Sequence, residues 1–136
     1  MIPRHLDKAL CELGQQEISG AEANPRISEY LVTVRQGLSD EIPWCAAFVN
    51  WCLPNGTGLA NAKSYLHWGY KIKEPKLGCI VIFNRGTEKW QGHVGFYLDE
   101  VGDYIYLLGG NQGNKVSIRA YNKNALRNYR WSDELV

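Results

Sequence analysis

The chain has 136 residues, of which 45% are hydrophobic and 21% are charged, and its formal net charge is +1. These values are typical of one soluble domain that is large enough to bury a core, so we expect residues 1–136 to form a single domain. The small net charge and the scattered Lys123, Arg127 and Arg130, which we interpret as a solvated face, argue against binding of nucleic acid. No stretch approaches the ~20 apolar residues of a membrane span, so no membrane insertion is expected.

The N-terminal sequence and the cysteines indicate where the protein is made. Met1 to Lys8 lacks the apolar run and small-residue cleavage site of a secretory signal, so we expect synthesis in the cytoplasm. The cysteines at positions 11, 45, 52 and 79 form no Cys-x-x-Cys pair and are too sparse for a stapled scaffold, which predicts reduced thiols. Neither the cysteines nor the histidines have the short spacings of a zinc site, and we expect no metal or other cofactor.

The first half of the chain predicts helices. Leu6, Leu10 and Leu13 share one face of a first helix over Pro3–Leu13, which Gly14 ends. Asn24-Pro25 is typical of a helix cap followed by a first-turn proline, and it opens a second helix that runs to Gly37. Further helices are expected from Pro43 to about Leu53 and, more briefly, from Ala62 to Trp68.

The second half has the spacing of strands. Ile80–Phe83 is a short apolar run that suits a strand buried on both faces, and His93–Leu98 is the next strand. Two more strands are expected at Tyr104–Leu108 and Lys115–Arg119. Because the connections are short, the strands should pair in an antiparallel meander. The predicted class is α+β, with N-terminal helices packed against an antiparallel sheet of four or more strands.

Cys45 lies in the stretch around which the chain is organised, from Pro43 to Cys52. Pro43 suits the first turn of a helix, and Asp40 or Glu41 can cap it, which places Cys45 in the first helical turn. Main-chain N–H groups and the helix dipole stabilise a thiolate there. The alternative is that Cys45 is a small buried hydrophobic residue.

His93 and Asn111 can complete a catalytic group with Cys45. His93 follows Gly92 at the start of a strand, and Asn111 comes just after the end of the next strand, so an antiparallel hairpin brings them to the same end of the sheet. His93 can then accept the thiol proton, and the Asn111 amide can orient the imidazole. The alternatives are a histidine satisfied by a main-chain carbonyl and a turn asparagine.

Four motifs carry a family resemblance. Trp44-Cys45-Ala46-Ala47-Phe48-Val49, Gly78-Cys79-Ile80-Val81-Ile82-Phe83, Gly92-His93-Val94-Gly95-Phe96 and Gly109-Gly110-Asn111-Gln112 resemble, in order and spacing, the CHAP amidohydrolase/peptidase domains of the NlpC/P60 group. The resemblance covers the chain from Asp40 onward. It implies a papain-like α+β fold and hydrolysis of amide bonds in bacterial peptidoglycan.

The resemblance also implies roles for single residues. Cys45 is the expected nucleophile, His93 the base and Asn111 the third polar residue. Many CHAP domains place a Glu two positions before that third residue, where this chain has Gly109. Glu17, Asp40 and Glu41 are therefore alternative orienting groups. Tyr65, Trp68 and Trp90 are weaker candidates for a substrate groove, because aromatic residues at such spacing are more often part of the core.

The expected activity is that of an N-acetylmuramoyl-L-alanine amidase or a peptide-stem endopeptidase. A cysteine amidohydrolase or thiol acyltransferase acting on a non-wall substrate, and an inactive wall-binding module, remain alternatives. Without an export signal, a wall hydrolase would reach the periplasm as a phage endolysin or as an injected antibacterial effector. We expect a monomer, with an immunity protein as a further partner if the protein is an effector.

Overall fold

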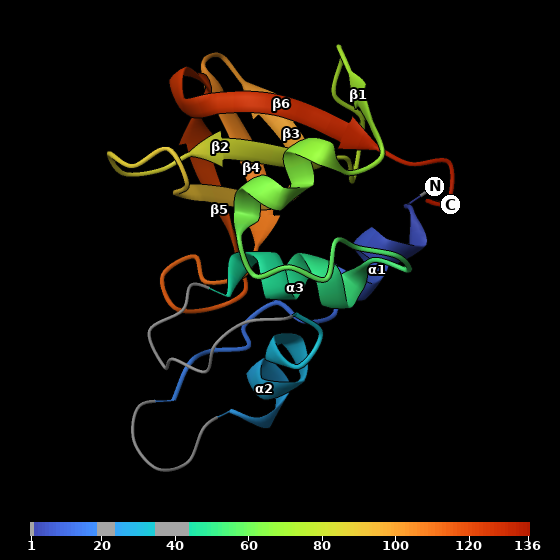
Figure 1. Cartoon of the computed structure of the whole chain (residues 1–136), viewed down its shortest axis with the longest axis vertical. Helices are drawn as coiled ribbons and strands as arrows, with labels where there is room; N and C mark the ends of the chain where they lie inside the picture. The colour runs from blue at the N-terminus through green and yellow to red at the C-terminus, as the bar shows by residue number, and fades with distance from the viewer. Residues whose placement is uncertain (1, 19–23, 35–43) are drawn as a thin grey trace.

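The chain is described by a computed structural model that covers residues 2–18, 24–34 and 44–136. In this part of the chain, helices α1 (Arg4–Leu10), α2 (Pro25–Leu31) and α3 (Cys45–Cys52) precede the sheet, and the short 3-10 helix η1 (Ala62–His67) follows them. Figure 1 shows α1, α2 and α3 together on one side of the sheet. The α+β class predicted from the sequence is confirmed.

The first two helices follow their predicted start signals. The side chain of Asn24 accepts a hydrogen bond of 2.9 Å from the Arg26 N–H, and Pro25 occupies the first turn of α2. Helix α1 ends at Leu10 rather than at Leu13, because the chain then turns toward Gly14, which has a φ of 94°. The predicted end of the second helix at Gly37 lies outside the described residues.

Helix α3 occupies the centre of the molecule. It begins at Cys45, and six of its eight residues are buried, because α1 and α2 pack on one side of it and β3 (Gly92–Val101) packs on the other. Trp44, directly before the helix, and Phe48 within it are 2% and 0% exposed. The capping predicted from Asp40, Glu41 and Pro43 lies outside the described residues.

The sheet contains six strands in the order β1-β6-β2-β3-β4-β5, and all neighbours are antiparallel. The last four strands in this order form the predicted meander. They are β2 (Ile80–Asn84), β3, β4 (Tyr104–Gly109) and β5 (Ser117–Asn122). The last of these begins two residues later than predicted. The other two strands, β1 (Tyr70–Ile72) and β6 (Leu126–Trp131), were not predicted.

Strand β6 shows that the basic residues near the end of the chain were interpreted only partly correctly. Arg127 is exposed, but Arg130 is half-buried and donates to the main-chain carbonyl of Leu66. The strand lies between β1 and β2, with Tyr129 and Trp131 buried. Alternating charged and aromatic residues therefore mark a strand with one covered face.

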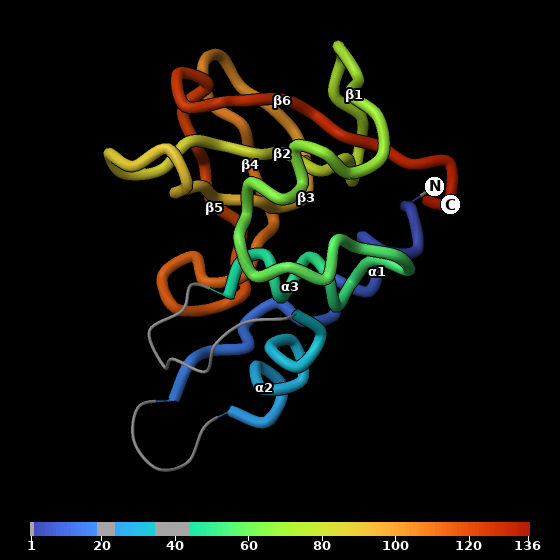
Figure 2. Tube along the Cα trace, in the orientation of Figure 1, coloured from blue at the N-terminus to red at the C-terminus, as the bar shows by residue number. Residues whose placement is uncertain are grey.

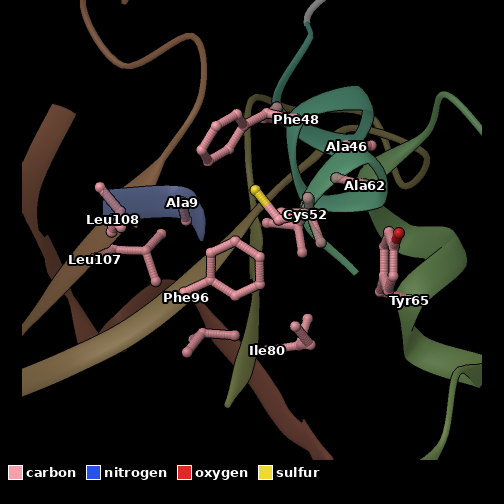
Figure 3. Packing of buried hydrophobic residues seen from close by; sticks show 14 of the residues in the cluster. Ala9, Ala46, Phe48, Cys52, Ala62, Tyr65, Ile80, Phe96, Leu107 and Leu108 are labelled. Atoms are coloured by element: carbon pink, nitrogen blue, oxygen red, sulfur yellow. The ribbon is translucent and has the colours of Figure 1, made fainter. Parts of the chain in front are cut away.

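A single hydrophobic cluster joins the helices to the sheet. Figure 3 shows side chains of α3, η1 and the central strands meeting there, among them Phe48, Cys52, Tyr65 and Phe96. The two ends of the chain lie close together in Figure 2, and the Arg4 N–H donates a 2.7 Å hydrogen bond to the Val136 carbonyl. Among the described residues, no helix has the length and apolar character needed to cross a membrane.

Candidate active site

Cys45 is the first residue of α3 and is only 2% exposed. The first N–H groups of a helix have no partner within the helix, and the positive end of the helix dipole lies there. A negative sulfur is favoured at this position. The helix cannot shift easily, because the side chains of Trp44 and Phe48 are enclosed by the core.

His93 is the second residue of β3 and is 4% exposed. Its Nε2 lies 2.8 Å from Oε1 of Gln112. Its Nδ1 is buried and has no hydrogen-bond partner of good geometry among the described residues. Nε2 is therefore hydrogen-bonded to Gln112, and Nδ1 is free to interact with Cys45.

Gln112 determines which nitrogen of His93 carries a proton. Its amide nitrogen donates to the main-chain carbonyls of Leu107, at 3.2 Å, and Ser117, at 2.8 Å. Because both donors of the amide are used, its oxygen faces His93 and must accept a hydrogen bond from a protonated Nε2. Nδ1 of the neutral ring is then unprotonated and can act as a base.

The pKa values of Cys45 and His93 show that the two side chains interact. Burial by itself raises the pKa of the Cys45 thiol, but the charge and the close approach of His93, with the Val94 main chain, bring that pKa below its ordinary value. Burial lowers the pKa of His93, yet Cys45 and then Gln112 raise it above its ordinary value. The shifts favour a thiolate beside an imidazolium.

Tyr121 covers one face of the imidazole. Its ring stacks on His93 with centroids 5.1 Å apart and planes at 30°, and on Phe83 at 5.2 Å. This contact brings β5 back toward β2, three strands away, so the sheet must curl strongly. Burial raises the pKa of Tyr121 to about 12, and the ring therefore stays neutral beside the imidazolium.

The loop that carries Gln112 is held tightly on both sides. A Cβ atom at Gly110 would lie 2.6 Å from Cβ of Phe48, so the loop passes directly against α3. A Cβ atom at Gly109 would lie 2.4 Å from Oε1 of Gln112 and 3.5 Å from Nε2 of His93. The glycine at 109 thus leaves the space that the Gln112 side chain occupies.

The contact expected from Asn111 is made by the adjacent Gln112. Asn111 has a left-handed backbone, with a φ of 57°, and it lines the neighbouring cleft, while Gln112 makes the hydrogen bond with His93. Among the alternative orienting groups, Glu17 accepts a hydrogen bond from Nε1 of Trp44. Asp40 and Glu41 lie outside the described residues.

A cleft of about 370 Å³ opens beside His93. Its walls come from the end of β2, the Gln112 loop and β5 with the turn that follows it; they are formed by Phe83, Asn84, Arg85, His93, Asn111, Gln112, Gly113, Arg119, Tyr121, Asn122 and Ala125. Cys45 is not among the residues that form the wall. In the described ranges, no three His, Cys, Asp or Glu side chains are grouped so that they could hold a metal ion.

The three weaker aromatic candidates lie away from this cleft. Tyr65 is fully buried in the core, as Figure 3 shows, and burial raises its pKa to about 12. Trp68 packs against Tyr65 and donates a 2.8 Å hydrogen bond to the Asn55 carbonyl. Trp90 is 69% exposed between β2 and β3. None of these three residues lines the cleft beside His93.

The other cysteines differ from Cys45. All four are free thiols. Cys52 and Cys79 are buried, and burial raises the pKa of both thiols, to about 12 for Cys79. Cys11 is exposed on the turn after α1. Of the three buried cysteines, Cys45 alone has a pKa shifted toward the thiolate.

A cysteine at a helix start that faces a histidine on an antiparallel sheet is the arrangement of papain-type cysteine amidases and peptidases. The family model described as the CHAP domain matches residues 37–111, which is more than half of the chain, and the chain belongs to this family. CHAP domains occur in NlpC/P60-like cysteine amidases and peptidases and are typically hydrolases. The matched region contains Cys45 and His93, and Gln112 follows it directly. No curated protein matches the chain.

Proposed function

We propose that this protein is a cysteine-dependent hydrolase that cleaves an amide bond of bacterial peptidoglycan, as an N-acetylmuramoyl-L-alanine amidase or a peptide-stem endopeptidase. The observation that carries the proposal is the coupled pair of Cys45 and His93, with the tautomer of His93 set by Gln112. Membership of the CHAP family supports a peptidoglycan-related amidase or peptidase activity.

The proposed reaction has two acyl-transfer steps. The Cys45 thiolate attacks the amide carbonyl, and the N–H at the start of α3 holds the resulting oxyanion. Nδ1 of His93 gives its proton to the leaving amine, the C–N bond breaks, and a thioester forms. Water then loses a proton to Nδ1, attacks the thioester and releases a carboxylic acid, while Cys45 is regenerated.

Gln112 and Tyr121 are positioning residues in this mechanism. Gln112 keeps the proton on Nε2, so that Nδ1 faces the thiol in the state that can accept or donate a proton. Tyr121 holds the plane of the imidazole by stacking. Both contacts limit rotation of a ring whose nitrogen must serve as acid and base in turn.

Digestion of purified sacculi tests the proposal. The wild-type protein should release soluble muropeptides, and mass spectrometry of the new ends identifies the bond that is cut. Cys45→Ala should release none. Binding to sacculi without release by the wild type would instead indicate a wall-binding module.

Two related activities use the same side chains. A cysteine amidohydrolase on a non-wall amide, or a thiol acyltransferase, would leave sacculi intact but form an acyl-enzyme on Cys45, which intact-protein mass spectrometry detects after exposure to activated acyl donors. Delivery to the wall as a phage endolysin or as an injected effector, with an immunity protein in the second case, stays a prediction from the sequence, as does the monomeric state.

A further inference from the structure

Two guanidinium groups line the cleft beside His93. Arg85 directly follows β2, and it lies close enough to the catalytic pair that its charge lowers the pKa of both Cys45 and His93. Arg119 lies on β5, and its side chain covers Gly113: a Cβ atom at Gly113 would be 2.5 Å from Nη2 and 3.2 Å from Cζ of Arg119. The two side chains come from different elements and meet at one cleft.

Neither guanidinium has an acidic partner among the described residues. The ion pairs in this part of the chain use Arg26 and Lys123, with Glu12, Glu29 and Glu100 as their acceptors. The described cleft wall contains no Asp or Glu, and its remaining polar residues are amides, a tyrosine and His93. The cleft is therefore positively charged, with side-chain donors and no competing carboxylate.

We propose, on the basis of the function proposed above, that Arg85 and Arg119 bind a free carboxylate of the substrate peptide next to the amide that Cys45 attacks. Arginine presents a planar pair of donors that matches a carboxylate, and such charge-assisted hydrogen bonds are about twice as strong as neutral ones. The substrate class is thus a peptide with an acidic residue, or a free chain end, beside the scissile bond. A carboxamide at the same place would offer these donors no charge.

A pair of synthetic substrates tests this proposal. Once the cut bond is known from the sacculi digest, two peptides are made that differ only in a free carboxylate or a carboxamide on the residue next to it. The wild-type kcat/KM should be on the order of 10–100-fold higher for the carboxylate peptide. Equal values for the two peptides would overturn the proposal, while turnover of either one would still support the hydrolase.

Substitutions assign the preference to the two arginines. Arg119→Gln and Arg85→Gln should bring the ratio of the two kcat/KM values toward one, and Arg119→Lys should restore part of it. The ratio is compared within each variant, so the effect of the Arg85 charge on the pKa of Cys45 and His93 cancels. Arg4→Gln, an exposed arginine on α1 outside the cleft, is the matched control and should keep the wild-type ratio.

Binding gives a result that does not depend on hydrolysis. Cys45→Ala protein is titrated with each of the two peptides while the Nε–Hε signals of Arg85 and Arg119 are followed by NMR. The carboxylate peptide should shift both signals and bind at least about tenfold more tightly. Equal affinities, or unmoved arginine signals, would overturn the carboxylate site even if neither peptide were cleaved.

Discussion

The protonation state of the candidate site is set by a residue that performs no chemistry itself. Gln112 is 2% exposed and donates both amide hydrogens to the carbonyls of Leu107 and Ser117. Its oxygen is consequently committed to Nε2 of His93, and the basic nitrogen is turned toward the buried thiol of Cys45. A rotation of this amide would place a donor against Nε2 and would favour the opposite tautomer.

Replacing Cys45 with alanine should abolish hydrolysis while leaving the fold intact. The sulfur is the only nucleophile in the proposed reaction, so kcat/KM should fall by at least about a thousandfold. The loss of one buried sulfur should cost on the order of 1 kcal/mol in free energy of unfolding. Muropeptide release and thermal melting measure the two effects. Cys11→Ala, at an exposed thiol, is the control, and undiminished activity of the Cys45 variant would exclude the cysteine mechanism.

Gln112→Ala should reduce kcat/KM by about 10–100-fold and alter its pH dependence. The hydrogen bond that His93 donates to Gln112 raises the pKa of His93. Without this bond the imidazolium should lose its proton at lower pH, and the alkaline limb of the kcat/KM profile should move to lower pH. A purely structural loss would lower activity without moving the limb.

Asn111→Ala is the matched comparison for Gln112→Ala, because the two residues are adjacent in the same loop. Asn111 lines the cleft but has no hydrogen bond to His93, so its replacement should leave the alkaline limb where it is. A limb that moved with Asn111→Ala and not with Gln112→Ala would restore the role first predicted for Asn111.

At the scale of elements, the helix starts were predictable and two strands were not. Asn24-Pro25 carries local signals for a cap and a first turn, and these need no knowledge of the rest of the fold. Strand β1 has only three residues, and β6 alternates arginines with aromatic residues, which resembles a solvated surface. Their strand character comes from pairing with each other and with β2, and pairing between distant segments leaves no local pattern.

The same limit explains which residues of the candidate site could be predicted from the sequence. Cys45 and His93 stand at the start of an element, where a motif fixes their place within one residue. Gln112 was missed by one position, because the direction of a side chain after a strand depends on the left-handed backbone at Asn111. Tyr121 was missed because the predicted strand ended at Arg119, although the alternation of β5 continues to Asn122.

Gly109→Ala tests whether the end of β4 must stay open for Gln112. The added Cβ atom would lie 2.4 Å from Oε1 of Gln112, so the amide must leave its place beside His93. We expect kcat/KM to fall about as far as in Gln112→Ala. In the double variant the two losses should not add, because both remove the same hydrogen bond. Additive losses would mean that Gly109 acts on activity by another route.

At the scale of the whole molecule, two buried histidines make stability depend on pH in opposite directions. His5 donates from Nε2 to the Gly78 carbonyl at 2.7 Å, while its Nδ1 is buried without a partner among the described residues. Burial lowers the pKa of His5 below 6.5, and the bond to Gly78 offsets this only in part. The pKa of His93 is raised above 6.5. The pH range in which His5 changes the free energy of unfolding therefore lies below pH 6.5, and the range in which His93 does so lies above it.

His5→Gln should remove a loss of stability at mildly acidic pH. Below pH 6.5 the unfolded chain binds a proton at His5 that the folded protein does not, so the free energy of unfolding falls as the pH decreases toward the folded pKa. Glutamine can keep a donor for Gly78 but does not titrate. The free energy of unfolding, measured with urea from about pH 5 to about pH 7, should therefore change less steeply with pH in the variant than in the wild type below pH 6.5. Parallel slopes would mean that His5 is protonated equally in both states.

The proposed wall substrate predicts that toxicity depends on the compartment. Peptidoglycan is absent from the cytoplasm, so cytoplasmic expression in a Gram-negative host should be tolerated. The same chain fused to a periplasmic export signal should round or lyse the cells, and exported Cys45→Ala should not. Immunoblots of periplasmic fractions show that both exported proteins accumulate to the same level. Absence of toxicity from a folded, exported wild type would count against a wall substrate and favour a different amide. Equal toxicity of the exported Cys45→Ala protein would point to wall binding or to export stress, because the mechanism leaves that variant without a nucleophile.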